Sequence, residues 1–294
     1  MAPLIVASVA PGAGRTTVTA AIAWLAAQDG RAVAVRRAGD DDAARADAAL
    51  YAGVPGISAP REPVPLDALT PGGGVDLWEA PPGDVTQAAA RAKARVLLVA
   101  RGGLDEETRG QAERLGAQLA GVLLTAVPEK EAQSAAAPVI AALPEDRLLA
   151  GPSVRDVRDA LEARTLVEDG ADATLEWVVV APIASDPGAP YFTRWGRKAV
   201  VVRHEKADLM LAALGTELDC LIITGGREPL PYVLDRIRNE GRDLSVLLSP
   251  LDTYHTMRRI EKLYGANRFA GMRKVERAAQ LLRERLSVPI ETLL

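Results

Sequence analysis

The sequence has a single cysteine and only two histidines, which limits the chemistry that it can support. With Cys220 alone, no disulfide bond can form within the chain. Cys220 lies in the apolar run 220–223, where a small buried residue is expected rather than a nucleophile. His204 and His255 have no cysteine or histidine partner at a metal-ligand spacing. A chain of 294 residues can bury a large core without such crosslinks.

Long hydrophobic runs and a strong charge of either sign are also missing. No segment approaches the ~18 uninterrupted apolar residues of a membrane-spanning helix, and residues 1–8 lack the basic region that opens a signal peptide. The 35 basic and 39 acidic residues give a formal net charge of −4, which offers no general reason to bind nucleic acid or an anionic membrane. We therefore expect a cytoplasmic protein that binds neither.

Short apolar runs alternate with alanine-rich amphipathic stretches along the first half of the chain. This alternation is typical of β-α-β units and predicts an α/β domain with a parallel sheet. The expected strands are 4–9, 31–35, 75–78, 96–99 and 121–124, and the expected helices are 16–28, 41–51, 84–92, 105–115 and 134–142.

A break with the sequence Ala-Gly-Pro-Ser at residues 150–153 divides the chain. The length suits two domains at roughly 100–200 residues each, and we place them at residues 1–150 and 151–294. The second should be a smaller α/β domain with a C-terminal helix on its outside. Its expected strands are 177–181, 198–202, 221–224 and 244–248, and its expected helices are 154–161, 207–214, 229–239, 253–262 and 272–286.

Residues 8–17 join the first strand to the first helix, which is the context of a phosphate-binding loop (P-loop). Glycines let backbone N–H groups curl around a phosphate, and the start of the helix adds partial positive charge. Thr16 stands where a hydroxyl normally binds Mg²⁺. The predicted nucleotide-binding residues are Gly12, Ala13, Gly14, Arg15, Thr16 and Thr17.

Two residues depart from the P-loop pattern. Val9 replaces its first glycine, and Arg15 replaces its lysine. The second change is not conservative, because lysine is a compact ammonium on a flexible stem and arginine is a planar fork. The alternative is therefore a strand–turn–helix that keeps the loop shape and no longer binds nucleotide.

Acidic residues near the ends of neighbouring strands could complete a Mg²⁺ site. Glu79 ends an apolar strand beside the predicted loop and, with Thr16, is a candidate metal ligand. Asp40 and Asp41 follow the second strand and could hold Mg²⁺ through water. For these two we favour the alternative, a solvated loop and a helix N-cap.

A second candidate ligand site lies at strand ends in the second half. Gly225 and Gly226 follow a strand, so an anionic ligand could approach closely and pair with Arg227. Asp252 follows the next strand and could join this site or cap a helix. The alternative for the two glycines is a tight turn that requires positive φ.

Eight short motifs keep their order and spacing: PGAGRTT at 11–17, DLWE at 76–79, LAGVLL at 119–124, LPED at 143–146, GPSV at 151–154, AAL at 212–214, IITGG at 222–226 and LDTY at 251–254. Together they resemble a dethiobiotin synthetase-like P-loop domain followed by a DRTGG domain. This pair precedes the catalytic domain of long bacterial phosphate acetyltransferases and also occurs alone. The resemblance implies a P-loop NTPase-like parallel sheet, a smaller α/β DRTGG-like domain, and ATP and Mg²⁺ as possible cofactors.

The chain also departs from this family at sites that the family uses for nucleotide chemistry. The family strand that usually ends in Glu-Gly ends here in Glu79 and Ala80, and Thr125 stands where synthetase relatives place an adenine-reading asparagine. Together with Arg15, these residues favour an altered nucleotide site over an active ligase.

We therefore expect a nucleotide-binding regulatory or sensory protein with a degenerate P-loop, which forms a homodimer. One alternative is an ATP-dependent ligase of the dethiobiotin synthetase type, in which Arg15 would supply the phosphate-bridging cation. Another is a purely structural interaction module with an empty site. Because the sequence ends at Leu294, with no room for the catalytic domain, we expect no acetyltransferase activity.

Overall fold

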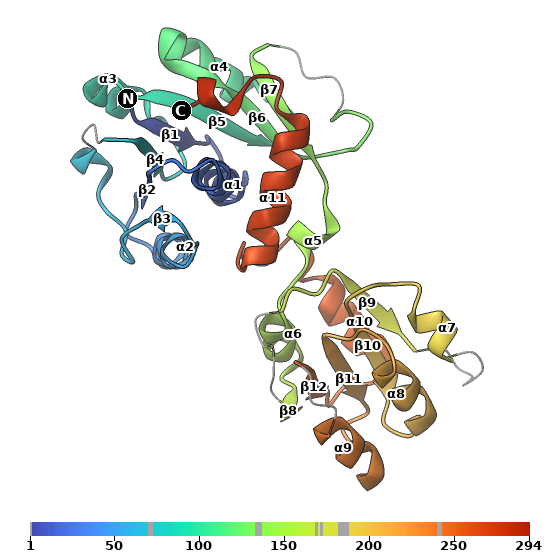
Figure 1. Cartoon of the computed structure of the whole chain (residues 1–294). Coiled ribbons are helices and arrows are strands. Elements are labelled where there is room, and N and C mark those ends of the chain that lie inside the picture. Colours follow the sequence, from blue (N-terminus) through green and yellow to red (C-terminus); the bar gives the residue numbers. More distant parts are fainter. Residues whose placement is uncertain are drawn as a thin grey trace. The chain divides into compact units, whose positions relative to one another are not determined.

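The computed structural model contains two compact units (Figure 1). Unit 1 comprises Met1–Asp146 and Met272–Leu294, and unit 2 comprises Arg147–Gly271. No helix among the described residues is long and apolar enough to cross a membrane. The structure describes residues 2–69, 73–132, 137–167, 170, 173–181, 188–239 and 243–294.

Unit 1 is built on a parallel sheet of seven strands in the order β3-β2-β4-β1-β5-β6-β7, which confirms the predicted α/β class. The central strand β1 has Leu4 opposite Leu77 of β4 and Arg95 of β5. All residues of β1 and β4 are buried, as expected for parallel strands covered on both faces. The strands are β1 Leu4–Ala7, β2 Val33–Arg37, β3 Ile57–Ser58, β4 Val75–Glu79, β5 Arg95–Arg101, β6 Leu119–Val127 and β7 Val139–Pro144.

Helices cover both faces of this sheet (Figure 1). Helices α3 and α4 pack on one face through Ala89, Ala92, Ala112 and Leu115. Helix α1 lies on the other face and packs against α11. The α-helices of unit 1 are α1 Arg15–Gln28, α2 Asp42–Ala52, α3 Thr86–Ala92, α4 Glu106–Leu115 and α11 Met272–Arg285, and short 3-10 turns cover Leu66–Ala68, Gly116–Gln118 and Ile290–Thr292.

The C-terminal helix belongs to unit 1, which differs from the predicted second domain of residues 151–294. Helix α1 is rich in small apolar residues that are buried around its whole circumference, so the sheet alone cannot cover it. Helix α11 supplies the missing cover with an apolar stripe that includes Val275, Ala278 and Leu282. The ion pairs Arg277–Asp146 at 2.7 Å and Arg285–Glu129 at 2.6 Å hold its polar side.

The predicted helix at residues 134–142 is wrong where the structure describes it. Residues 139–144 form the edge strand β7, which pairs with β6, while residues 134–136 lie outside the described part. Alanines at 141 and 142 favour a helix by propensity, but pairing with β6 outweighs this weak preference. A short apolar run cannot be assigned to helix or strand by periodicity alone.

Unit 2 has a five-stranded sheet in the order β8-β12-β11-β10-β9, in which β8 is antiparallel and the other strands are parallel. Buried apolar side chains lie on both faces of this sheet. Cys220 is buried in β11, and burial raises the pKa of its thiol, in agreement with the predicted inert residue. The elements are α5 Arg147–Ala150, α6 Val154–Leu161, β8 Arg164–Val167, β9 Trp177–Val180, α7 Gly188–Phe192, β10 Lys198–Arg203, α8 Ala207–Leu214, β11 Cys220–Thr224, α9 Pro231–Arg238, β12 Ser245–Leu248 and α10 Thr253–Glu261.

The two ends of unit 2 are held together inside the unit. The amide N–H of Gly265 donates to the carbonyl of Ala150 at 2.9 Å. The guanidinium of Arg147 lies 4.5 Å from the centre of the Trp177 ring and 5.5 Å from that of Tyr264. Such cation–π contacts are typically worth about 0.5–1 kcal/mol at exposed sites. They hold the start of unit 2, where the chain enters, close to its end, where the chain leaves.

We expect a fragment of residues 147–271 to fold on its own, because its ends meet and it has its own core. Circular dichroism should show a cooperative melt, and light scattering will give its mass. A fragment of residues 152–294 should melt less cooperatively, because it loses Arg147 and carries α11 without α1. If residues 147–271 show no cooperative melt, unit 2 requires the rest of the chain.

Candidate functional site

The predicted phosphate loop lies at the carboxyl edge of the unit 1 sheet. It follows β1, whose neighbours β4 and β5 lie on its two sides. The chain runs from β1 toward β2 and β3 and later returns to add β5 on the opposite side, so the strand order reverses at β1. Ligands of open parallel sheets bind outside the carboxyl ends of the strands at such a reversal. The topology therefore supports a ligand site at residues 8–17.

The backbone of the loop requires glycine at two positions. Gly12 has a φ of +71° and Gly14 a φ of +90°, in the left-handed region that glycine adopts without strain. A Cβ on Gly14 would also lie 3.1 Å from Cγ2 of Thr125, whereas one on Gly12 would meet nothing within 4 Å. Close packing thus holds one end of the loop, and Gly12 faces open space.

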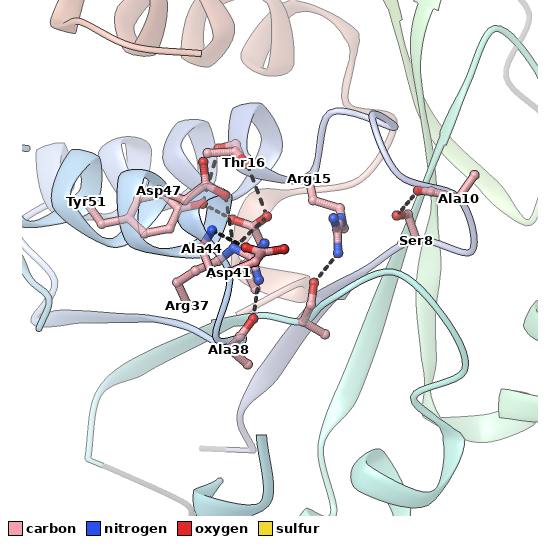
Figure 2. A network of polar contacts seen from close by, with 12 residues as sticks. Ser8, Ala10, Arg15, Thr16, Arg37, Ala38, Asp41, Ala44, Asp47 and Tyr51 are labelled. Carbon is pink, nitrogen blue, oxygen red and sulfur yellow. Dashed lines mark hydrogen bonds and ion pairs between the residues drawn. The ribbon is translucent and has the colours of Figure 1, made fainter. Parts of the chain in front are cut away.

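Thr125 fixes the loop from strand β6. Its Oγ1 donates a hydrogen bond to the carbonyl of Ala13 at 2.7 Å. At the start of the loop, Ser8 Oγ donates to the carbonyl of Ala10 at 2.6 Å (Figure 2). The residue that replaces the expected adenine-reading asparagine therefore has a defined contact with the loop itself.

Helix α1 begins directly after the loop without a side-chain cap. Its N-cap is Gly14, so no side chain accepts from the N–H groups of the first turn. These N–H groups have no partner within the helix and carry the positive end of its dipole. Together with the left-handed glycines, they give the loop the donors that a phosphate group accepts from.

Arg15 reaches from the start of α1 to the end of β4. Its Nη1 donates to the carbonyl of Ala80, as Figure 2 shows for the labelled Arg15. The side chain is only 8% exposed, and this burial lowers the pKa of its guanidinium, against the opposing effect of Glu79. The cation at the P-loop lysine position is therefore bound to the protein backbone.

Glu79 is the centre of a buried polar network. Figure 2 labels its partners Thr16, Arg37 and Tyr51. Its Oε1 accepts from the Thr16 hydroxyl at 3.1 Å and lies 3.4 Å from Arg37 Nε. Its Oε2 accepts from the Tyr51 hydroxyl. Burial raises the pKa of Glu79, while the charge of Arg37 and the hydrogen bond from Tyr51 oppose that shift. The predicted metal residues Thr16 and Glu79 are thus brought together, by a direct hydrogen bond.

Three residues of this network were missed from the sequence. Arg37 pairs with Asp47 through Nε at 3.0 Å and donates to the carbonyl of Ala38, and Tyr51 comes from the same helix as Asp47. The signal in the sequence was an arginine shortly after an expected apolar strand, because an arginine that is buried there needs an acidic partner. In the sheet, Arg37 of β2 lies directly opposite Glu79 of β4.

The acidic residues after β2 have a structural role. Asp41 is the N-cap of α2, with its side chain accepting from the amide N–H of Ala44 at 2.6 Å, which confirms the favoured alternative. Asp40 is exposed, and its carbonyl accepts from Arg45 at 2.9 Å. Among the residues that the structure describes, no group of three or more His, Cys, Asp and Glu side chains could hold a metal ion.

The candidate site of unit 2 is an exposed turn at the carboxyl edge of its sheet. Gly225 and Gly226 have φ values of +95° and +68°, and their amides donate to the carbonyls of Leu251 and Ser249. The two glycines thus form a tight turn that requires positive φ, and Arg227 beside it is exposed. The ligand site at these residues stays a prediction.

Asp252 is the N-cap of α10. It accepts from the amide N–H of His255 at 2.8 Å, and this hydrogen bond lowers the pKa of its carboxyl. The turn and Asp252 thus lie at the ends of neighbouring strands. Their segments are joined by the backbone hydrogen bond from Gly225 to Leu251 and by a 2.9 Å contact between the hydroxyls of Thr224 and Thr253.

The protein is thus a two-unit α/β protein. Unit 1 carries a glycine-rich loop at the point where the strand order of its parallel sheet reverses. Residues 156–263 match the family model of the DRTGG domain. The match lies within unit 2 and runs from α6 to just beyond α10, so the predicted DRTGG domain is confirmed there. The P-loop NTPase and phosphate acetyltransferase resemblances stay predictions.

Among solved structures, the chain is similar to the CBS and DRTGG domains of the regulatory region of Clostridium perfringens pyrophosphatase, a structure complexed with its activator, diadenosine tetraphosphate. The match has 17% sequence identity, a TM-score of 0.33 and covers 41% of this chain. The chain spans about half of that neighbour's length, at 51%.

We expect Tyr51→Phe to lower the stability of unit 1 by about 1–3 kcal/mol, because it leaves one oxygen of the buried Glu79 without its donor. Calorimetric melting of the full chain measures the change. Tyr232→Phe is the matched control, since its ring is 55% exposed and the change should stay within about 0.5 kcal/mol. Equal stability of the two variants would contradict the hydrogen bond to Glu79.

Proposed function

We propose that this chain is a nucleotide-binding regulatory protein. Unit 1 holds the phosphates of a nucleotide such as ATP at residues Gly12–Thr17 without turning it over. Unit 2, which contains the DRTGG domain and is called the DRTGG unit below, serves as the module through which the chain associates or senses a ligand. The left-handed glycines, the uncapped start of α1 and the position of the loop at the strand reversal support phosphate binding.

The observation that carries this proposal is the position of Arg15. A P-loop lysine lies over the loop, where it reaches the outer phosphates. Arg15 instead donates to the carbonyl of Ala80 and is buried beside Glu79. The loop keeps its backbone donors but lacks a mobile cation for the charge that develops during phosphoryl transfer. Such a site suits binding without turnover.

The same observation weighs against the ligase alternative. A ligase of the dethiobiotin synthetase type needs a cation that bridges the transferred phosphate, and Arg15 would have to leave its buried position to act so. Separating Arg15 from Glu79 would leave the carboxylate with less compensating charge, which is costly in a buried site.

The DRTGG unit contributes surface features that fit association or ligand sensing. Leu230, Tyr232 and Tyr254 are large hydrophobic side chains with exposed fractions of 53%, 55% and 68%. Large exposed aromatic side chains are enriched at protein interfaces. We retain the homodimer as part of the proposal, with Gly225, Gly226, Arg227 and Asp252 as the candidate ligand residues of this unit. Light scattering on residues 147–271 tests the association.

We expect Gly12→Asp to abolish nucleotide binding, because a carboxylate at an open position of the loop repels phosphate. Gly30→Asp is a matched control: Gly30 has a φ of +75°, close to the +71° of Gly12, and a Cβ at either position meets nothing within 4 Å. Both variants carry the same charge change and similar backbone strain. Thermal melting with ATP or ADP at about 100 times Kd should show about 2.7 kcal/mol of stabilisation in the parent and Gly30→Asp only. Equal stabilisation of Gly12→Asp would place the nucleotide elsewhere.

We expect the parent chain to release phosphate from ATP more slowly than the ordinary enzyme range of ~1–10³ s⁻¹. Arg15→Lys should stay below that range, because Thr16 and Glu79 remain bonded to each other and to unit 1. A phosphate-release assay measures both rates. Turnover within the range in the parent would favour the ligase alternative, and turnover only in Arg15→Lys would make Arg15 the single barrier.

A further inference from the structure

The resemblance to P-loop NTPases implies Mg²⁺ beside Thr16 and Glu79, so the donor atoms there can be compared with what Mg²⁺ requires. The ion demands near-octahedral oxygen ligands at about 2.0–2.1 Å and usually keeps several waters. Glu79 is fully buried, and both of its carboxylate oxygens already face protein donors. The Tyr51 hydroxyl bonds Oε2, and Arg37 lies against Oε1. This carboxylate has no exposed face for a hydrated ion.

The positive charge beside Glu79 comes from two arginines. Arg37 is 4% exposed and lies between Glu79 and Asp47, with its Nε 3.4 Å and 3.0 Å from their carboxylates. Arg15 is bound to the carbonyl of Ala80, the residue after Glu79. Two guanidinium charges thus offset two carboxylates. In the protein without nucleotide, a divalent ion placed among them would add repulsion that no further acid of this network offsets.

The backbone acceptors and acids nearby are also in use. The carbonyl of Ala80 accepts from Arg15, the carbonyl of Ala38 accepts from Arg37, and the Asp41 carboxylate caps α2. The Glu79 carboxylate, the carbonyls of Ala38 and Ala80 and the Asp41 carboxylate are therefore committed to protein donors. The groups that surround the Glu79 carboxylate do not fit the ion.

We propose that Arg15 and Arg37 occupy the place of Mg²⁺ beside Glu79, so that the loop binds the phosphates of a nucleotide without a metal ion. This inference rests on the proposed function. Guanidinium groups remain charged at all physiological pH values and bond carboxylates and carbonyls in a fixed plane. They hold Glu79 and the start of α1 in place, and the backbone N–H groups of the loop are left to bind phosphate.

The test is a calorimetric titration of the full chain with ADP and with ATP, once in EDTA and once in excess MgCl₂. We expect the affinity in EDTA to lie within about twofold of that in MgCl₂. A gain of about tenfold or more on adding Mg²⁺ overturns the inference and leaves the proposed function standing. Absence of binding in both conditions overturns the proposed function and, with it, this inference.

A second readout needs no nucleotide affinity. Mn²⁺ reports on Mg²⁺ sites by electron paramagnetic resonance, and we expect the protein alone to leave the free Mn²⁺ signal unchanged.

Two neighbouring variants extend the nucleotide titrations. Thr16→Val and Thr17→Val should each change the nucleotide affinity by the same factor in EDTA and in MgCl₂. Loss of a Mg²⁺-dependent gain in Thr16→Val alone, or capture of Mn²⁺ by the parent, would show that Thr16 binds a metal.

Discussion

The buried carboxylate of Glu79 is the constraint on which the glycine-rich loop of unit 1, residues 8–17, depends. An ionised carboxylate out of water costs several kcal/mol unless partners compensate it. Its partners here come from three elements: Arg37 from β2, Tyr51 from α2 and Thr16 from α1. Satisfying one charge therefore fixes two helices and a neighbouring strand around the end of β4. The pKa of Glu79 is nevertheless raised, because its loss of hydration on burial outweighs the stabilisation that Arg37 and Tyr51 give to the charged carboxylate.

This constraint determines the character of the loop. Thr16 is drawn toward β4 by Glu79, and Arg15 is drawn to the adjacent carbonyl of Ala80. On the other side, Thr125 of β6 holds the carbonyl of Ala13 and packs against Gly14. The loop is thus tied to strands on both sides of β1, while its N–H groups remain available as donors. In the proposed function, a site arranged in this way binds an anion and is poorly supplied with groups that could move during a reaction.

The sequence was sufficient for features that depend on local pattern. The strand, loop and helix at residues 4–28, the Asp41 cap and the DRTGG unit follow from short motifs and apolar runs. The role of Glu79 was seen only in part, because its partner Arg37 lies opposite it solely through the pairing of β2 with β4. Strand order is a non-local property that the spacing of residues does not specify. The edge strand β7 was missed for a related reason, since its pairing with β6 overrides alanine propensity.

The position of α11 is also a non-local property that the sequence pattern does not specify, here at the level of domains. Its apolar stripe predicts that the helix packs on something, but amphipathicity does not identify the partner. The partner is α1, whose buried small residues need cover on the side away from the sheet. The chain leaves unit 1 after Asp146, forms the DRTGG unit, and returns at Met272 to complete the first core. Helix α1, which begins at the glycine-rich loop, is therefore covered by the segment that follows the DRTGG unit. The core of unit 1 consequently needs chain from both sides of that unit, and the DRTGG unit is an insertion rather than a C-terminal appendage.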